Sequence, residues 1–319
     1  MTPKVSRYSA AFVPPLYDPH VRDEGLRSSC FASLDVLSAQ FGDDIPYGGG
    51  LDRGFPFRGS RVPFLSRFKG IHRAAAQEGP AALSLNTSFA SPYDDEPVTD
   101  GFRYAYRSGS IDQPDNRALR AAHALGVPLA YFVATQPGTY KAIYPCYVVQ
   151  DDAIARQALI APGHMVGPLD ERTPEPIADP LERRYGVREE RVRLHQARFR
   201  GRVLVAYSHK CTICRLKEGR LLDAAHIVGD LEQRGEPHVD NGLSLCSIHH
   251  RAFDQDLVGI APDYRVQVSR RLLDDEDGPM LELLKTSHDQ LIELPSKRAW
   301  RPDPDRLALR FERFTAASG

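Results

Sequence analysis

Long apolar runs are missing from this sequence of 319 residues. No stretch reaches the roughly eighteen consecutive apolar residues of a membrane-spanning helix, which excludes a transmembrane protein. The opening residues, MTPKVSRYSAAFVPP, also lack the apolar core of a secretory signal peptide. Hydrophobic residues make up 42% of the chain and charged residues 26%, as in ordinary globular proteins. We therefore expect a cytoplasmic protein with no membrane partner.

Cysteine is scarce and unevenly distributed, with five residues in the whole chain. Cys30 and Cys146 stand alone among apolar or aromatic neighbours, which favours buried packing thiols over reactive ones. The other three, Cys211, Cys214 and Cys246, lie close together in the last third of the chain. In a reducing compartment, three clustered cysteines indicate a metal site before they indicate a disulfide.

An excess of one charge sign is also missing overall, since the formal net charge is −1. This balance conceals a basic segment at 183–220, which has twelve Arg or Lys and three Glu. Such a block is typical of nucleic-acid contact, and a solvated helix face is the alternative interpretation. The proline-rich stretch before it has no apolar periodicity and indicates a connector. We therefore expect two domains, 1–165 and 187–319, joined by a linker at 166–186.

The N-terminal part is predicted to have an α+β fold. Short segments rich in aromatic and β-branched residues, bounded by Gly, Pro and Asp, are typical of strands: ALSLNTS, FRYAYR, PLAYFVAT and TYKAIYPCYVV. Two segments that end in glycine are typical of helices: CFASLDVLSAQFG and NRALRAAHALG. Several strands with few helices predict a curved sheet or a partly closed β-barrel.

The C-terminal part opens with a basic amphipathic helix, RVRLHQARFRGRVLVAY, followed by two metal-binding knuckles. Cys211 and Cys214 form a CxxC pair, and Cys246 and His249 repeat that spacing with a histidine. Three thiolates and one imidazole make a closed tetrahedral site, so we expect a structural Zn²⁺ ion. The thirty-odd residues between the knuckles must hold structure of their own. They predict a strand that ends at His226, a loop, a second strand at NGLSLC and a helix that starts at SIHHRAFDQDL.

Further polar residues recur within this frame. His226 ends an apolar strand, Asn241 precedes the next strand, and His250 follows the second knuckle. Asp254 lies four residues after His250, so both project from one face of a helix. His226 and Asn241 are fifteen residues apart, and Asn241 and His250 are nine apart. Together with the flanking AAHI and HRAFD, this pattern resembles the HNH, or ββα-metal, endonuclease motif.

The resemblance implies hydrolysis of a phosphodiester bond. His226, neutral near pH 7, would take the proton from the attacking water as general base. A divalent ion, Mg²⁺ or Mn²⁺, would hold the scissile phosphate and the leaving oxygen. His250 would ligate that ion with Asp254 as a second ligand, and Asn241 would fix the loop and the orientation of His226.

One position departs from the family pattern. Many members place an Asp or His immediately before the general base as a metal ligand, whereas this chain has Ala225. Asp254, the nearby Asp223 or a water molecule would then complete the metal site. The departure affects the identity of the ligands and not the class of reaction.

The first half resembles the SRA-like domains of the PUA superfamily that precede HNH domains in modification-dependent, type IV restriction endonucleases. The matching stretches are ALSLNTS, PYDDEPVTDGFRYAYR, PDNRALRAAHALGVPLAYFVAT and PGTYKAIYPCYVV. SRA-type domains flip a base out of the duplex and hold it between aromatic faces, with an acid that reads the cytosine edge. The pocket that this implies would use Tyr93, Asp94, Asp95, Tyr104 and Tyr106.

Other roles are open to these residues. Phe102, Tyr104 and Tyr106 alternate along one face of a strand, which also favours core packing, and YDDE is equally compatible with a turn. Four cations are candidates for contacts with phosphates, which position a protein on DNA without specifying sequence: Arg58, Arg61, Lys69 and Arg73.

The hypothesis from sequence is an endonuclease directed to DNA that contains 5-methylcytosine or 5-hydroxymethylcytosine. An HNH nuclease acting on unmodified DNA or another nucleic acid is the alternative. A non-catalytic zinc-stabilised DNA-binding protein is disfavoured, because a binder does not need His226, Asn241 and His250 together. One HNH core makes one nick, so a double-strand break predicts a homodimer.

Overall fold

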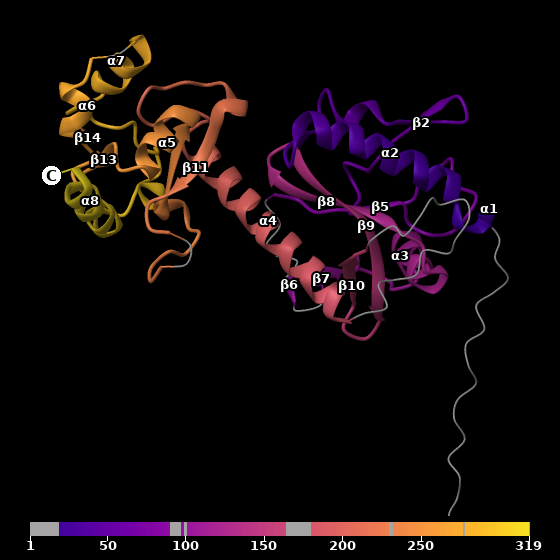
Figure 1. The fold of residues 1–319 in the computed structure, drawn as a ribbon. Coiled ribbons are helices and arrows are strands. Elements are labelled where there is room, and N and C mark those ends of the chain that lie inside the picture. Colours follow the sequence, from indigo (N-terminus) through magenta and orange to yellow (C-terminus); the bar gives the residue numbers. More distant parts are fainter. Residues whose placement is uncertain are drawn as a thin grey trace, which may run out of the picture. The chain divides into compact units, whose positions relative to one another are not determined.

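The computed structural model describes residues 19–89, 97–98, 101–163, 180–229, 232–276 and 278–318. The chain separates into two compact units (Figure 1). One comprises Met1–Val133 and Tyr140–Glu190, and the other comprises Ala134–Thr139 and Arg191–Gly319. No helix in the described ranges combines the length and the apolarity needed to cross a bilayer. The domain boundaries expected from the sequence remain a prediction.

An eight-stranded sheet is the centre of the first unit, and its strand order is β4-β5-β8-β9-β10-β7-β6, with β1 paired to β9. The sheet is mixed, because β5 and β8 are parallel whereas β10 is antiparallel to both β9 and β7. It is curled, as the sequence predicted, and β2 and β3 form a separate hairpin (Figure 1). The strands are β1 (Ile45–Pro46), β2 (Phe55–Phe57), β3 (Ser60–Val62), β4 (Ile71–His72), β5 (Ser84–Asn86), β6 (Pro97–Val98), β7 (Gly101–Ala105), β8 (Leu129–Gln136), β9 (Thr139–Asp152) and β10 (Gln157–Pro162).

Three helices accompany this sheet: α1 (Pro19–Arg22), α2 (Glu24–Phe41) and α3 (Pro114–Leu125). Helix α3 begins with proline at its first position and ends at Gly126, whose φ of 58° provides the left-handed cap that favours glycine. Helix α2 buries its apolar face, including Leu26, Phe31 and Leu34, in one core with Phe132 of β8. The predicted strands and helices of this part are therefore confirmed, and β10 is an element that the sequence analysis did not identify.

The second unit is built around a hairpin and the helix that follows it. Its elements are α4 (Pro180–Ala206), β11 (Leu222–His226), β12 (Gly242–Cys246), α5 (Ser247–Asp254), β13 (Val258–Ile260), β14 (Val266–Val268), α6 (Arg270–Asp274), α7 (Pro279–Lys285) and α8 (Pro304–Ser318). Short 3₁₀ turns at Gly219–Leu221 and Val239–Asn241 lead into the two strands. The predicted order of strand, loop, strand and helix is confirmed, and the elements after α5 were not predicted.

Helix α4 is longer than the sequence suggested. It begins at Pro180, inside the stretch 166–186 that was predicted as a connector without secondary structure. Proline is favoured at the first position of a helix, and the LERRY that follows contains good helix formers, so the frequent prolines concealed a helix start. From Leu194 onward the helix is buried on more than one side, with Ala197 on one side and Phe199 and Val203 on another.

Candidate active site

Four potential metal ligands lie within 4.8 Å of one another: Cys211, Cys214, Cys246 and His249. The sulfurs of Cys214 and Cys246 are 3.8 Å apart, and Nδ1 of His249 is 3.7 Å from the sulfur of Cys211. In a zinc tetrahedron with bonds of about 2.3 Å to sulfur and 2.0–2.1 Å to nitrogen, such edges measure about 3.5–3.8 Å. The fold thus brings together the four donors that the knuckle spacing predicted.

The cluster is assembled from a turn and from the junction between a strand and a helix. The CxxC turn follows α4 and is tied to β12 by the Thr212 N–H, which donates to the Ser244 carbonyl at 2.7 Å. Cys246 is the last residue of β12, and His249 lies in the first turn of α5. A metal ion held by all four donors would therefore fasten the ends of the hairpin to the start of the helix.

The three cysteines influence one another's ionisation. Hydrogen bonding with Cys211, assisted by His249, outweighs burial and lowers the pKa of Cys246 to about 3. The pKa of Cys211 is raised by its hydrogen bond with Cys246, and burial raises the pKa of Cys214. A divalent ion would supply the positive charge needed for all three thiolates to form. Three thiolates and one imidazole are a donor set that suits zinc.

The hairpin places His226 opposite Gly242 in the antiparallel register of β11 and β12. The His226 ring stacks on Phe199 of α4, with centroids 3.9 Å apart and ring planes 16° apart. A side chain at Gly242 would overlap Val203 and would approach Phe199 to 3.0 Å. The absence of a Cβ at this glycine is therefore what lets α4 reach the hairpin and support the histidine.

Asn241 closes the loop that joins the two strands. Its side chain is fully buried, accepts from the Val228 N–H at 2.9 Å and donates to the carbonyls of Val228 and Glu236 at 3.0 and 3.1 Å. Its own carbonyl accepts from the Ile227 N–H, immediately after His226, at 2.9 Å. The side chain of Asn241 consequently holds both ends of the loop, and its backbone carbonyl fixes the chain next to His226.

His250 lies between two carboxylates. Its Nδ1 is 3.6 Å from Asp223 of β11, and its Nε2 is 3.5 Å from Asp254, one turn further along α5. Asp223 is also paired with Arg200 of α4, at 3.2 Å. Ala225, at the position where the family pattern has a ligand, is fully buried in the core of this unit. Asp223 shares its strand face with Ala225, because residues two apart on a strand point the same way.

Comparison with known families agrees with this geometry, because residues 211–261 match the family model described as HNH endonuclease. These residues form an HNH endonuclease domain. The match includes the hairpin, the helix and the metal-ligand cluster, so the enzyme class predicted from the sequence, a nuclease, is confirmed.

Other comparisons add little to this assignment. Curated protein sequences give no match to the chain. Among solved structures, the chain is similar to one described as a modification dependent TagI restriction endonuclease. The two are 16% identical, the alignment covers 73% of this chain and 81% of the other, and the TM-score is 0.29. A superposition this weak does not establish a common fold.

Two side chains that support the HNH site lie outside the matched residues, on α4. Phe199 stacks on His226, and its neighbour Arg200 pairs with Asp223 and donates to the Leu222 carbonyl at 2.7 Å. Sequence analysis predicted this basic helix but did not connect its side chains with the site. The available signal was the RFR triplet in an amphipathic helix that ends just before the first knuckle.

The last helix, α8, also reaches the loop of the HNH hairpin. Arg306 is only 8% exposed and donates to the carboxylates of Asp240 and Glu236, each at 2.9 Å. Both acids belong to the segment that leads into Asn241. The loop that carries Asn241 is thus fixed from two sides, by the asparagine inside and by Arg306 outside.

In the first unit, the structure describes only part of the predicted base pocket. Tyr93, Asp94 and Asp95 lie outside the described residues. Tyr104 and Tyr106 are 7% and 6% exposed, and the Tyr106 hydroxyl donates to an aspartate of β9 at 2.6 Å. Such burial is typical of core packing, the alternative that the alternation along this strand also favoured.

The four cations proposed to touch phosphates already have partners within the protein. Arg73 donates to two backbone carbonyls and Arg61 to one. Arg58 pairs with a glutamate at 2.8 Å, and Lys69 pairs with Asp115 at 3.1 Å. The side chains of Arg58 and Lys69 remain 64% and 51% exposed, so both cations are open to solvent.

Proposed function

We propose that the protein is a modification-dependent restriction endonuclease that hydrolyses phosphodiester bonds of DNA containing 5-methylcytosine or 5-hydroxymethylcytosine. The nuclease half of the proposal is supported by the match of residues 211–261 and by the stacked, loop-anchored His226. The target half is supported by the resemblance of sequence stretches between residues 82 and 149 to SRA-like domains. Double-stranded DNA is the substrate that both halves share.

His226 is the general base in this proposal. The stack on Phe199 limits rotation of the imidazole, and the backbone beside it is held by Asn241. A fixed, neutral imidazole can accept the proton of an attacking water without reorganising at the moment of reaction. Asn241 acts through the loop and does not touch the reacting atoms.

His250 and Asp254 are the proposed ligands of the catalytic Mg²⁺ or Mn²⁺ ion. One ring nitrogen of a metal-binding histidine usually bonds the metal, while the other donates to a carboxylate. Asp223 is paired with Arg200, so it suits the orienting role at Nδ1, and Asp254 beside Nε2 is then the candidate ligand, although the two side chains are similarly exposed, 52% and 49%. The imidazole and carboxylate donors of this site fit such an ion, which would stabilise charge on the phosphate and the leaving oxygen.

The Cys₃His cluster is proposed to hold a structural Zn²⁺ ion, because its four donors leave no position for water or substrate. We place the protein in the cytoplasm, where the thiols of this cluster would stay reduced. A homodimer would supply the second active site needed to cut both strands, since each HNH domain breaks one.

A cleavage assay tests this function directly. Plasmids with and without cytosine methylation are incubated with the full chain and Mg²⁺ or Mn²⁺. We expect cleavage of the methylated plasmid only, and loss of that cleavage in His226→Ala. Equal cleavage of both plasmids would leave an HNH nuclease with another target, and no cleavage of any DNA or RNA would favour a non-catalytic zinc-stabilised binder.

Metal dependence distinguishes the two carboxylates. His250→Ala and Asp254→Asn should each lose activity that is partly restored at high Mg²⁺ or Mn²⁺ concentration, because they weaken metal binding. Asp223→Asn should also lower activity. It should raise the metal concentration needed for half-maximal rate less than His250→Ala and Asp254→Asn do. The reverse order for the two aspartates would assign the ligand role to Asp223.

A further inference from the structure

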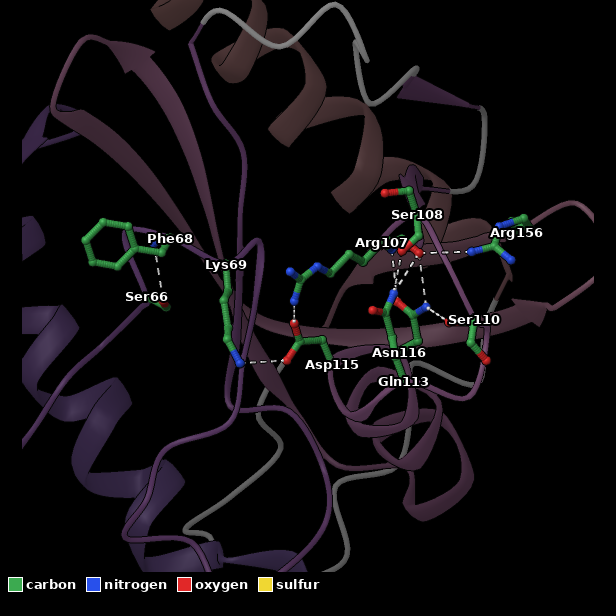
Figure 2. Close-up of polar contacts among 10 residues, drawn as sticks. All are labelled: Ser66, Phe68, Lys69, Arg107, Ser108, Ser110, Gln113, Asp115, Asn116 and Arg156. Carbon is green, nitrogen blue, oxygen red and sulfur yellow. Dashed lines mark hydrogen bonds and ion pairs between the residues drawn. The ribbon is translucent and has the colours of Figure 1, made fainter.

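The loop before β4 exposes one aromatic side chain almost completely. Phe68 is 96% exposed, although the other phenylalanines among the described residues of its unit are buried or half-buried. In the described part of the chain its ring stacks on no other aromatic or guanidinium group. Figure 2 shows the ring at the tip of the loop, pointing away from the polar contacts behind it. An aromatic ring displayed in this way has surface to offer a partner on both faces.

The loop behind Phe68 is tied to the rest of the unit by hydrogen bonds and a close contact. The Phe68 N–H donates to the Ser66 hydroxyl at 3.3 Å, which forms a local turn (Figure 2). On the other side, the Asn86 N–H of β5 donates to the Gly70 carbonyl at 2.8 Å. A side chain at Gly70 would overlap the Tyr104 hydroxyl, so the loop lies directly on the strand that carries Tyr104. The exposure of Phe68 is consequently built into the fold and does not arise from a loose loop.

Cations lie on the loop that carries Phe68 and on the segment that meets this loop at Asp115. Arg67 and Lys69 flank Phe68 in the chain, and Lys69 shares Asp115 with Arg107, at 3.1 and 2.6 Å (Figure 2). Asp115 is nearly buried, whereas the side chains of Lys69 and Arg107 are 51% and 57% exposed. One carboxylate therefore orients two cations and neutralises only one, which leaves positive charge open to solvent beside Phe68.

The segment that carries Arg107 is itself held in place. The Asn116 side chain accepts from the Arg107 N–H and donates to the Arg107 and Ser110 carbonyls (Figure 2). Gln113 and Arg156 also donate to the Arg107 carbonyl, at 3.0 and 2.9 Å. The cations next to Phe68 are thus presented by backbone that is already ordered before a ligand arrives.

We infer that this surface docks duplex DNA, with Phe68 inserted as a wedge into the base stack and Lys69 and Arg107 on the flanking phosphates. The inference deepens the proposed function, because it names the part of the first unit that meets the duplex. Apolar wedges such as phenylalanine open base steps in many DNA-bending proteins, and cations on the backbone position them.

The geometry favours a wedge over a base-binding pocket. A pocket encloses a flipped base between two walls, whereas Phe68 is open on both faces. An exposed aromatic ring on the same surface as guanidinium and ammonium groups suits a nucleic acid. The cations can contact the phosphates, and the ring can contact the bases. Phe68 would therefore contact the DNA, whereas the buried Tyr104 supports the loop that carries Phe68.

Fluorescence of a reporter base tests the wedge. The full chain is titrated, without added Mg²⁺ or Mn²⁺, with a methylated duplex that has 2-aminopurine beside the modified cytosine, and with its unmodified counterpart. We expect the wild type to raise the fluorescence of the methylated duplex, because the reporter becomes unstacked. Phe68→Ala should abolish most of this rise and weaken binding about 10- to 100-fold, as removal of a base-stacking aromatic does. Phe68→Trp should retain both.

Matched controls separate the wedge from general effects. Val36→Ala removes another exposed apolar side chain, 66% exposed on α2, and should behave as the wild type. Phe68→Ala should keep the melting temperature, because almost none of the ring is buried. Unchanged fluorescence and affinity in Phe68→Ala would overturn the inference.

The same titration distinguishes failure of the inference from failure of the proposed function. If Phe68→Ala still prefers the methylated duplex and still raises its fluorescence, Phe68 is not a wedge, but the proposed modified target stands. If the fluorescence rises equally on both duplexes and this rise depends on Phe68, the wedge stands, but the proposed modified target is wrong. A full chain that binds neither duplex overturns both.

Discussion

The two units of this protein differ in how their functional residues are brought together. In the HNH domain, all the proposed site residues from Cys211 to Asp254 lie on a CxxC turn, the hairpin that follows it and the next helix. In the first unit, Lys69 meets Asp115 across 46 residues, and the exposed Phe68 depends on strands elsewhere in the chain. A local unit makes sequence spacing informative, whereas a surface assembled from distant loops leaves no fixed interval to recognise.

The units also differ in what stabilises the functional part. The Cys₃His cluster can fix its hairpin through metal bonds, which are strong and directional. The Phe68 surface is held by hydrogen bonds and by ion pairs with exposed partners, each of which contributes little. Substitutions at the metal cluster should therefore affect folding much more than substitutions at the Phe68 surface.

The largest effect is expected for Cys211→Ser. Loss of one thiolate should prevent zinc binding and unfold the second unit, because a structural zinc site contributes on the order of 10 kcal/mol to folding. Zinc content by atomic absorption and unfolding by circular dichroism measure this. Cys30→Ala, at a buried thiol whose pKa is raised by burial, should keep its zinc. A folded Cys211→Ser protein with full zinc content would contradict the proposed metal site.

His226→Ala should produce the next largest effect, on rate and not on folding. Removal of a general base typically lowers the rate about 10²–10⁴-fold. DNA affinity and melting temperature should stay close to those of the wild type, because no metal ligand is lost. His195→Ala, at an exposed histidine of α4, is the matched control and should retain full activity. Cleavage at the wild-type rate by His226→Ala would exclude the assigned general base.

Phe199→Leu tests whether α4 belongs to the catalytic centre. Leucine keeps an apolar side chain but loses the ring stacked 3.9 Å from His226, so kcat should fall about tenfold while KM changes little. Leu194→Ala, a buried site more than one turn away on α4, should lower the melting temperature without a comparable loss of kcat. If both variants lose activity in proportion to stability, Phe199 has only a packing role.

The sequence predicted the HNH domain better than it predicted the first unit. The helix start at Ser247 and the strand that ends at His226 follow from local patterns, so the frame of the HNH domain was predicted correctly. The contacts of Phe199 and Arg200 were not, because α4 reaches the hairpin only where Gly242 leaves room. In the first unit, strand alternation placed Tyr104 on one face but did not decide between pocket and core. The exposure of Phe68 has no local sequence signal at all.

The smallest effect concerns Asp115, which orients Lys69 and Arg107. Burial alone would raise the pKa of this carboxyl, but hydrogen bonds from Arg107 and Lys69 give a net lowering from 3.8. A lowered pKa means that the folded state is stabilised above the unfolded-state value and that this stabilisation is lost as the pH falls through the folded-state pKa. Asp115→Asn should therefore reduce the free energy of unfolding by about 0.5–1 kcal/mol at pH 7, since its partners are half exposed.

The pH dependence of that loss separates charge from shape. Urea unfolding at pH 7, 5 and 3 measures the free energy of unfolding of the wild type and of Asp115→Asn. The gap between these two free energies should narrow below pH 4, where the wild-type carboxyl also becomes neutral. Asp52→Asn, at an exposed aspartate of the same unit, should show no such gap. High salt should narrow the gap at pH 7, because exposed ion pairs are screened. A difference in the free energy of unfolding that persists unchanged at pH 3 would mean that Asp115 acts through hydrogen-bond geometry that an amide does not reproduce, and not through its charge.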